Sequence, residues 1–301
     1  MLKLASSQLK ISPKEASNYA QYLYMKGYIS YPRTGSTKYS PNFDYENNLR
    51  FLIESFRNSE IDENLLNLYN RFDNDIIYLK KGIEKGGHQP IIPLKRFVFF
   101  NNDQEKLSKL ICLYFFASLS QPLEYEIKEY NMKIGDYSFI GSSSKIIKEG
   151  FLVFQSIKKN EYISEFPPLK ENRIYPILKY GIEKKYTESP DYLTESELID
   201  KMEQYNIGTD GSIPSHIHNL TLRGYIKVDE KRRLIPTKLG IALINSLNIV
   251  DPDIIKPENR ARIERFVKDI ENGDKNFNEA LENAITFYKR SLLNAIIISM
   301  N

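Results

Sequence analysis

Tyr31 and Arg33 are the first residues whose types and spacing could do chemistry, within the stretch GYISYPRTGSTKYS at 27–40. The residues around Tyr28 favour a short strand, and Pro32 ends that strand directly after Tyr31. Tyr31 is therefore expected at a strand tip, with its hydroxyl placed to meet solvent or a ligand. The alternative is a half-buried strand tyrosine beside a surface arginine.

Two loops carry further groups suited to binding. His88 follows two glycines in GGHQPIIP (86–93), where backbone freedom allows a close approach to a ligand. The loop NIGTDGSIPSHI (206–217) runs into a helix N-terminus, a geometry that suits phosphate. Capping of that helix by an aspartate or serine explains the same residues equally well. The polar residues concerned are Thr209, Asp210 and Ser212.

Metal binding and ATP hydrolysis receive little support from the sequence. Two Asp-x-Asp pairs adjoin predicted helix starts, so helix capping is favoured over metal binding. His216 and His218 lie two apart on a predicted helix and therefore face different ways. No phosphate loop of the type G-x-x-x-x-G-K-[ST] is present. The aspartate pairs are Asp73 with Asp75 and Asp251 with Asp253.

The composition is that of an ordinary soluble globular protein, with 301 residues, 41% of them hydrophobic and 27% charged. This length suggests two or three domains. The single cysteine, Cys112, excludes an internal disulfide framework and a cysteine zinc site, and its apolar neighbours favour a buried thiol. No apolar stretch reaches the length of a membrane span and no signal peptide opens the chain, which favours an intracellular protein.

A repeated pattern links the two ends of the chain. Capping boxes open helices at SPKE (12–15) and TESE (194–197). The stretches LYMKGYIS (23–30) and LTLRGYIK (220–227) each end a helix at glycine and turn into a strand. The second copy continues into a β-ribbon and another helix, which is the pattern of a winged helix, a fold that commonly binds DNA. We therefore expect two winged-helix-like units.

The middle of the chain has a different residue pattern. Alternation of apolar and polar residues from about 123 to 185 predicts β-strands. An amphipathic helix is expected before it at 103–120, and two closing helices are expected after 250. Basic residues cluster at 222–238 and 256–268, although the net charge is only +3.

Three motifs together resemble one family, the type IA DNA topoisomerases. They are, in order, LYMKGYISYPRT, GHQPIIP and PDYLTESELIDKMEQYNIGTDGSIPSHI. The chain is most similar to eukaryotic topoisomerase III of the beta type, and the resemblance covers nearly the whole chain.

The resemblance implies a role for each candidate residue. Tyr31 would be the nucleophile that attacks a phosphodiester and forms a 5′-phosphotyrosyl link. The Arg33 guanidinium would bind the phosphoryl oxygens, and His88 would bond to the same phosphate region. Because the covalent link conserves the energy of the broken backbone, religation would need no ATP. The residues expected to contact DNA are Lys38, Thr209, Asp210, Ser212 and Arg223.

The resemblance also implies an α+β fold arranged as a gated ring. Residues 1–95 would form a winged-helix-like domain that bears the catalytic tyrosine. Residues 96–185 would form a β-rich arch that opens to pass a second strand. Residues 186–301 would form a helical domain with its own winged helix, lining the groove for a single strand.

Two departures from the family leave two functional hypotheses open. The family holds its Mg²⁺ in a Toprim domain, and this chain is expected to begin after that domain. Gly35 and Gly87 also stand where the family usually has acids. The first hypothesis is an enzyme that acts on single-stranded DNA or RNA, with the Toprim domain supplied in trans. The second is a non-catalytic module that binds single strands. The nucleus is the expected location if the protein is eukaryotic, and the cytoplasm otherwise.

Overall fold

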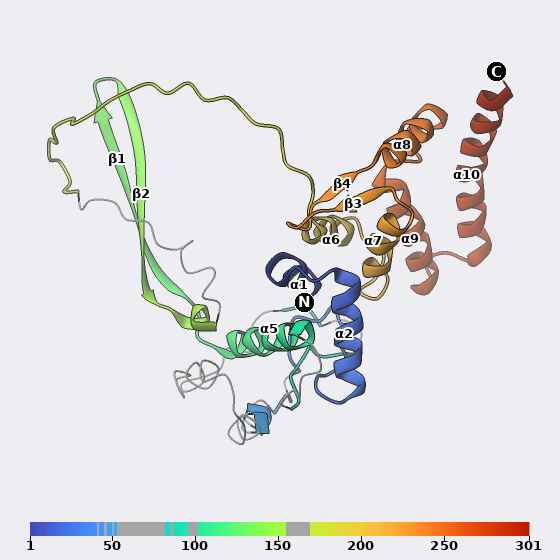
Figure 1. The fold of residues 1–301 in the computed structure, drawn as a ribbon, viewed down its shortest axis with the longest axis horizontal. Helices are drawn as coiled ribbons and strands as arrows, with labels where there is room; N and C mark the ends of the chain where they lie inside the picture. The colour runs from blue at the N-terminus through green and yellow to red at the C-terminus, as the bar shows by residue number, and fades with distance from the viewer. Residues whose placement is uncertain are drawn as a thin grey trace. The chain divides into compact units, whose positions relative to one another are not determined.

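The computed structural model describes residues 1–40, 42–44, 47–49, 51–52, 82–84, 87–95, 102–154 and 169–300. The chain divides into two compact units. The first unit comprises Met1–Met25, Asn101–Leu107 and Asp191–Asn301, and the second comprises Lys26–Phe100 and Ser108–Pro190. Helices and antiparallel two-stranded sheets occur together, so the expected α+β class is confirmed (Figure 1).

The first unit opens with two helices, α1 (Leu2–Leu9) and α2 (Pro13–Met25). The predicted capping box is present at the start of α2. The backbone N–H of Glu15 donates to the Ser12 hydroxyl at 3.2 Å, and the backbone N–H of Ser12 donates to the Glu15 carboxylate at 3.3 Å. Gly27, with φ of +69°, follows the helix in the left-handed conformation that commonly ends one.

The winged-helix pattern predicted for the second copy is confirmed. A capping box between Thr194 and Glu197 opens α6, and β3 and β4 pair antiparallel as the wing. Buried Ile199 on α6 and Ile213 and Ile217 on α7 form the core between the two helices. The elements are α6 (Glu195–Gln204), α7 (Ile213–Leu222), β3 (Ile226–Val228), β4 (Leu234–Pro236) and α8 (Lys238–Val250).

The two predicted closing helices are α9 (Pro257–Glu271) and α10 (Phe277–Met300). Helix α10 packs against both α8 and α9. A buried contact helps to hold it, because the Ser291 hydroxyl on α10 donates to the Asp251 carboxylate at 2.5 Å, directly after α8. Among the described residues, no helix has the length and apolarity needed to cross a membrane.

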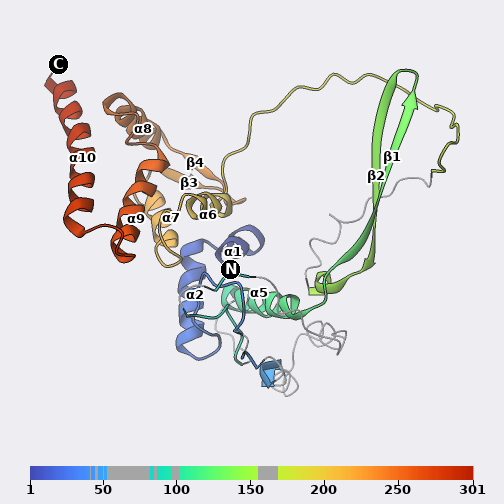
Figure 2. The same cartoon turned by 180° about the vertical axis from the view of Figure 1, so that it is seen from behind.

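The second unit contains most of α5 (Asn102–Leu119), a long β-hairpin and a short 3-10 helix, η1 (Gly150–Phe154). The hairpin consists of β1 (Glu124–Ile134) and β2 (Tyr137–Lys148), paired antiparallel along their whole length. Figures 1 and 2 show it as one long twisted ribbon. The helix at 103–120 and the strands at the start of the β-rich segment are therefore confirmed.

The strands predicted for the end of the β-rich segment are wrong. Residues 173–190 form neither helix nor strand, and Ile174, Leu178 and Ile182 are 97%, 94% and 103% exposed. Alternating residues favour an extended backbone, but a strand also needs a neighbour whose N–H and C=O groups complete the ladder. The described residues provide no such neighbour here.

Candidate active site and nucleic-acid interface

The segment that bears Tyr31 runs antiparallel to the segment that follows His88. Ile29 and Pro93 form an isolated β-bridge, flanked by two backbone hydrogen bonds. The Ser30 N–H donates to the Ile92 carbonyl at 2.9 Å, and the Leu94 N–H donates to the Tyr28 carbonyl at 2.7 Å. The strand predicted at Tyr28–Tyr31 is thus reduced to a single bridge. The reason is local, because Pro32, Pro90 and Pro93 have no N–H with which to extend a ladder.

The side chain of Ser30 fixes the register of these two segments. Its hydroxyl accepts a hydrogen bond of 2.8 Å from the Ile92 N–H and donates one of 3.3 Å to the Pro90 carbonyl. Ile29 is fully buried beside it, so the bridge is anchored in the interior of the unit. Sequence reasoning missed Ser30, because nothing in the residues around it signals a partner in a distant segment.

This register brings Tyr31 and His88 together. Their ring centroids lie 4.7 Å apart, with the rings tilted by 42°. The Thr34 hydroxyl approaches the His88 carbonyl at 3.4 Å, which ties the loop after Tyr31 to the same segment. Tyr31 is half-buried and His88 is exposed, so a ligand could reach both side chains from solvent.

Arg33 is exposed and close in sequence to Tyr31. Among the described residues, no carboxylate forms an ion pair with its guanidinium. An unpaired guanidinium presents a fork of N–H donors that matches two oxygens of a phosphate. A phenol hydroxyl, an imidazole and a guanidinium without an ion pair among the described residues lie on two adjoining segments, and these are groups that phosphoryl transfer can use.

The two glycines noted in the sequence lie in the same region. Gly87 has φ of +70°, and no atom lies within 4 Å of the position that a Cβ would take. An acid at this position would meet open space, and its cost would come from the left-handed backbone alone. Thr37 anchors the loop beyond Gly35, since its N–H donates to the Ile83 carbonyl at 2.8 Å and its hydroxyl accepts from the Ile83 N–H at 2.9 Å. Lys38 follows and is exposed.

The loop before α7 differs in detail from the phosphate cradle expected there. The N–H groups of Ser212 and Ile213 donate to the Thr209 carbonyl, and those of Ser215 and His216 donate to the Ser212 carbonyl. The first-turn amides are thus engaged within the helix, and Pro214 has none. The Ser212 hydroxyl accepts from the Thr209 N–H at 2.8 Å and does not cap the helix.

The Ser212 side chain therefore does not cap α7, and the amides from Ser212 to His216 that have an N–H are engaged in backbone hydrogen bonds. The loop also presents side chains, because Thr209 and Asp210 are both exposed. Arg223, at the end of α7, is exposed as well. Contact of these residues with DNA stays a prediction. Thr209, Asp210, Ser212 and Arg223 belong to the first unit, whereas Tyr31, Arg33, Lys38 and His88 belong to the second.

Comparison with known proteins gives consistent matches. A family model described as DNA topoisomerase matches residues 1–282. The chain is 35% identical over 294 residues to DNA topoisomerase 3-beta of Drosophila melanogaster, covering 96% of this chain and 32% of that protein. It is 34% identical over 295 residues to DNA topoisomerase 3-beta-1 of Homo sapiens, covering 96% of this chain and 33% of that protein.

A solved structure agrees. Full-length topoisomerase I from Thermotoga maritima superimposes with a TM-score of 0.70 at 28% identity, covering 96% of this chain and 47% of that one. The chain belongs to the DNA topoisomerase family. The resemblance to type IA enzymes, and to the beta type of topoisomerase III, is thereby confirmed. This topoisomerase chain spans about a third of the length of the curated relatives that it matches.

Type IA topoisomerases use Mg²⁺, and the described part of this topoisomerase chain does not fit such an ion. Within it, no cluster of three or more His, Cys, Asp or Glu residues could hold a metal. Asp251 instead accepts hydrogen bonds from Ser291 and from the Asp253 N–H, which closes a turn, and Asp253 pairs with Lys256 at 2.7 Å. Asp73 and Asp75 lie outside the described residues.

Proposed function

We propose that this chain carries the strand-cleaving centre of a type IA DNA topoisomerase that changes DNA topology without ATP. The observation that supports this most directly is the contact between Tyr31 and His88, with Arg33 two residues along the chain and without an ion pair among the described residues. The alternative, a binding module without chemistry, is less favoured because all three groups are present and the chain belongs to an enzyme family.

In the proposed reaction the Tyr31 oxygen attacks the phosphorus of one phosphodiester in a single strand. The Tyr31 O–P bond forms as the bond from phosphorus to the 3′-oxygen breaks, which leaves a 5′-phosphotyrosyl link and a 3′-hydroxyl end. The phenol gives up one proton and the leaving 3′-oxygen takes one, so the step is neutral overall. Religation is the same step in reverse, and it needs no ATP because one phosphoester replaces another.

Each of the three residues has a proposed part in that step. Charge builds on the phosphoryl oxygens in the transition state, and Arg33 can bind two of these oxygens at once. His88, beside the Tyr31 ring, lies within reach of the same phosphate and can donate a hydrogen bond to it. Lys38, Thr209, Asp210, Ser212 and Arg223 are proposed to contact the strand itself.

The proposal also covers the metal-binding domain, the division of the chain into domains, the substrate and the location. We place the Mg²⁺-binding carboxylates in a Toprim domain outside the 301 residues, on the same polypeptide or on a separate chain. We retain the three expected domains, 1–95, 96–185 and 186–301, as a proposal alongside the two contact-defined units. Single-stranded DNA is the proposed substrate, RNA is the second candidate, and the nucleus is the proposed location by analogy with the eukaryotic relatives.

The test is adduct trapping with the chain fused to a Toprim domain in the presence of Mg²⁺. A single-stranded oligonucleotide labelled at its 3′ end should yield a labelled protein adduct, whereas the same strand labelled at its 5′ end should yield only a shorter free fragment. Tyr31→Phe should abolish the adduct. Tyr28→Phe is the matched control and should retain it, because the Tyr28 ring contacts Lys95 rather than His88. An adduct that persists in Tyr31→Phe refutes the assignment.

A further inference from the structure

A pocket between α6 and α7 has an apolar floor and a basic rim. Leu198 and Met202 of α6 and Ile217 and Leu220 of α7 line the floor together with Ile207. The pocket measures about 330 Å³ and is partly open to solvent. This volume lies at the lower end of the range that small-molecule sites occupy in proteins, about 300–1,000 Å³. Ile217 of this floor belongs to the buried cluster of the winged helix, and Leu198 and Met202 pack against that cluster.

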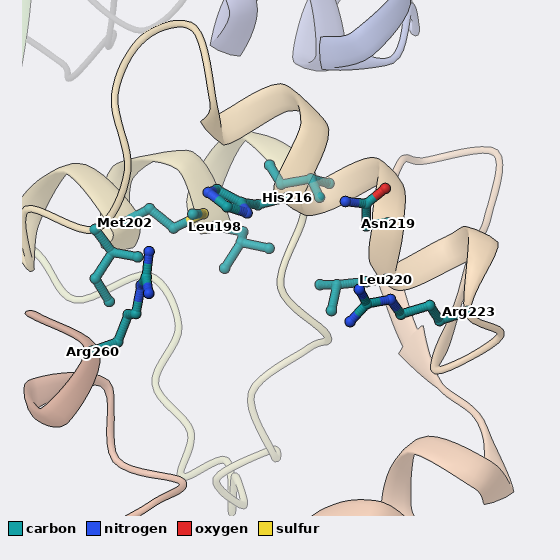
Figure 3. A pocket seen from close by; sticks show the side chains of 9 residues that line it. Leu198, Met202, His216, Asn219, Leu220, Arg223 and Arg260 are labelled. Atoms are coloured by element: carbon teal, nitrogen blue, oxygen red, sulfur yellow. The ribbon is translucent and has the colours of Figure 1, made fainter. Parts of the chain in front are cut away.

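The rim of this α6–α7 pocket carries four polar groups, which are His216, Asn219, Arg223 and Arg260. Figure 3 shows Arg260 reaching toward Met202 from α9, with Arg223 beside Leu220 at the other end. None of the described residues that line the pocket is acidic. Within the described part of the chain, the side chains of His216, Asn219 and Arg223 make no hydrogen bond. Arg260 is held at one end by Glu264 at 2.6 Å.

The apolar floor and the basic rim of the pocket together suit a nucleotide. A flat base has two apolar faces that suit the Leu and Met floor, and polar edges that an amide such as Asn219 can pair with both as donor and as acceptor. Its phosphate carries the negative charge that two guanidiniums attract and that no carboxylate in the lining repels. An apolar peptide side chain would fill the floor and leave Arg223 and Arg260 without a partner.

We propose that the α6–α7 pocket receives one nucleotide of a single-stranded nucleic acid, with the base on the apolar floor and its phosphates on Arg223 and Arg260. The proposal rests on the nucleic-acid binding proposed above and adds a base-dependent contact to it. Ile207 lies in the same loop as Thr209, and His216 lies on α7 directly after that loop, so a strand that crosses the loop passes the mouth of the pocket.

The experiment compares two oligonucleotides of about eight nucleotides, within the ~4–16 nucleotides that single-strand-binding folds occupy. One is oligothymidylate, and the other has the same backbone with every base removed. Fluorescence anisotropy gives the affinity of each for the purified chain and its variants. Asn219→Ala should reduce the preference for the base-containing strand by about fivefold, the change that loss of one hydrogen bond typically produces. Arg223→Gln and Arg260→Gln should weaken both strands to a similar extent.

Matched controls exist on the same helices. His218→Ala on α7 and Arg265→Gln on α9 change exposed side chains outside the pocket and should leave both affinities and their ratio unchanged. All variants are surface changes, and thermal melts confirm that they fold. If oligothymidylate binds and Asn219→Ala keeps the full preference for bases, or His218→Ala loses it equally, the pocket proposal is overturned while the proposed function stands. If neither strand binds the unmutated chain, the proposed nucleic-acid binding fails as well.

Discussion

Arg232 donates two hydrogen bonds to the carboxylate of Glu195, at 2.8 Å from Nε and 2.7 Å from Nη2. Glu195 is only 3% exposed, and the Ser6 hydroxyl of α1 donates a third bond to it at 2.9 Å. A buried carboxylate with three donors joins the first helix of the chain to the first turn of α6 and to the wing. Glu195 is therefore a buried charge that helps to couple α1 to the winged helix, beside the exposed pairs of Lys3 with Asp200 and Glu203.

Removal of Arg232 should destabilise the fold, because the charge of the Glu195 carboxylate would stay buried. Arg232→Ala leaves Glu195 buried without its ion-pair partner, and we expect a loss of about 3–5 kcal/mol in the free energy of unfolding. Arg233→Ala is the matched control, since Arg233 pairs with the exposed Asp191 and with Asp229. Its loss should be much smaller, because ion pairs in contact with solvent contribute little to stability. Urea denaturation measures both, and equal losses would contradict the role given to burial.

Ser30→Ala should loosen the site without removing a reacting group. It deletes the bonds to the Ile92 N–H and the Pro90 carbonyl, which set the register that brings His88 to Tyr31. We expect a loss of about 1–3 kcal/mol in stability, since the buried Ile92 N–H keeps only part of its partners. Adduct yield in the Toprim fusion should fall but not vanish. Thr37→Ala removes a comparable tie farther along the loop and should preserve the yield better.

If the Mg²⁺-binding carboxylates belong to a Toprim domain, as proposed above, the chain alone should bind single strands and neither cleave nor relax DNA. If about four to six basic side chains meet phosphates, log affinity should fall with log salt at a slope of about −3 to −4, at ~0.7 per contact. Thr209→Ala should weaken binding equally for all sequences. Cleavage by the isolated chain with Mg²⁺ would show that acids outside the described residues, such as Asp73 and Asp75, take part in the reaction.

Acid should weaken the tie between α8 and α10. The hydrogen bonds that Asp251 accepts from Ser291 and then from the Asp253 N–H lower the pKa of its carboxyl from the usual 3.8. A lowered pKa in the folded state adds stability above pH 3.8, and this contribution disappears as the pH falls through the lower folded value. Ser291→Ala should therefore reduce the melting temperature most at neutral pH. The difference from the unmutated chain should shrink below about pH 4, and a constant difference would contradict this origin.

Local chemistry made parts of this fold predictable. Ser12 with Glu15, and Thr194 with Glu197, close capping boxes whose partners lie three residues apart, so the sequence contains both halves of the interaction. The wing and the closing helices follow from similar short-range patterns. The apposition of Tyr31 and His88 could not be derived this way, because it depends on backbone pairing between distant segments, and here the family resemblance carried the prediction.

The errors have the same origin. Alternation at the end of the segment 123–185 indicates which faces differ in polarity, but it does not encode the presence of a neighbouring strand. Ser212 could be assigned to a cap or to a phosphate cradle because both use a hydroxyl at a helix start, and the structure uses it to close the Thr209 turn instead. Asn219 of the α6–α7 pocket gave no signal, and Arg260 stood out only as part of the basic cluster at 256–268, since the pocket is lined by residues that lie far apart in the sequence.

Because Cys112 is buried, an introduced cysteine can be labelled without removal of the native one. It is the single cysteine of the sequence, it is buried on α5, and burial raises the pKa of its thiol to about 12. Its reactive thiolate is therefore nearly absent at neutral pH, and maleimides should not modify it. A cysteine introduced at exposed Tyr137, at the turn of the long hairpin, would be the one labelled site. Fluorescence from that position could follow the hairpin as a strand binds, with the native thiol left in place.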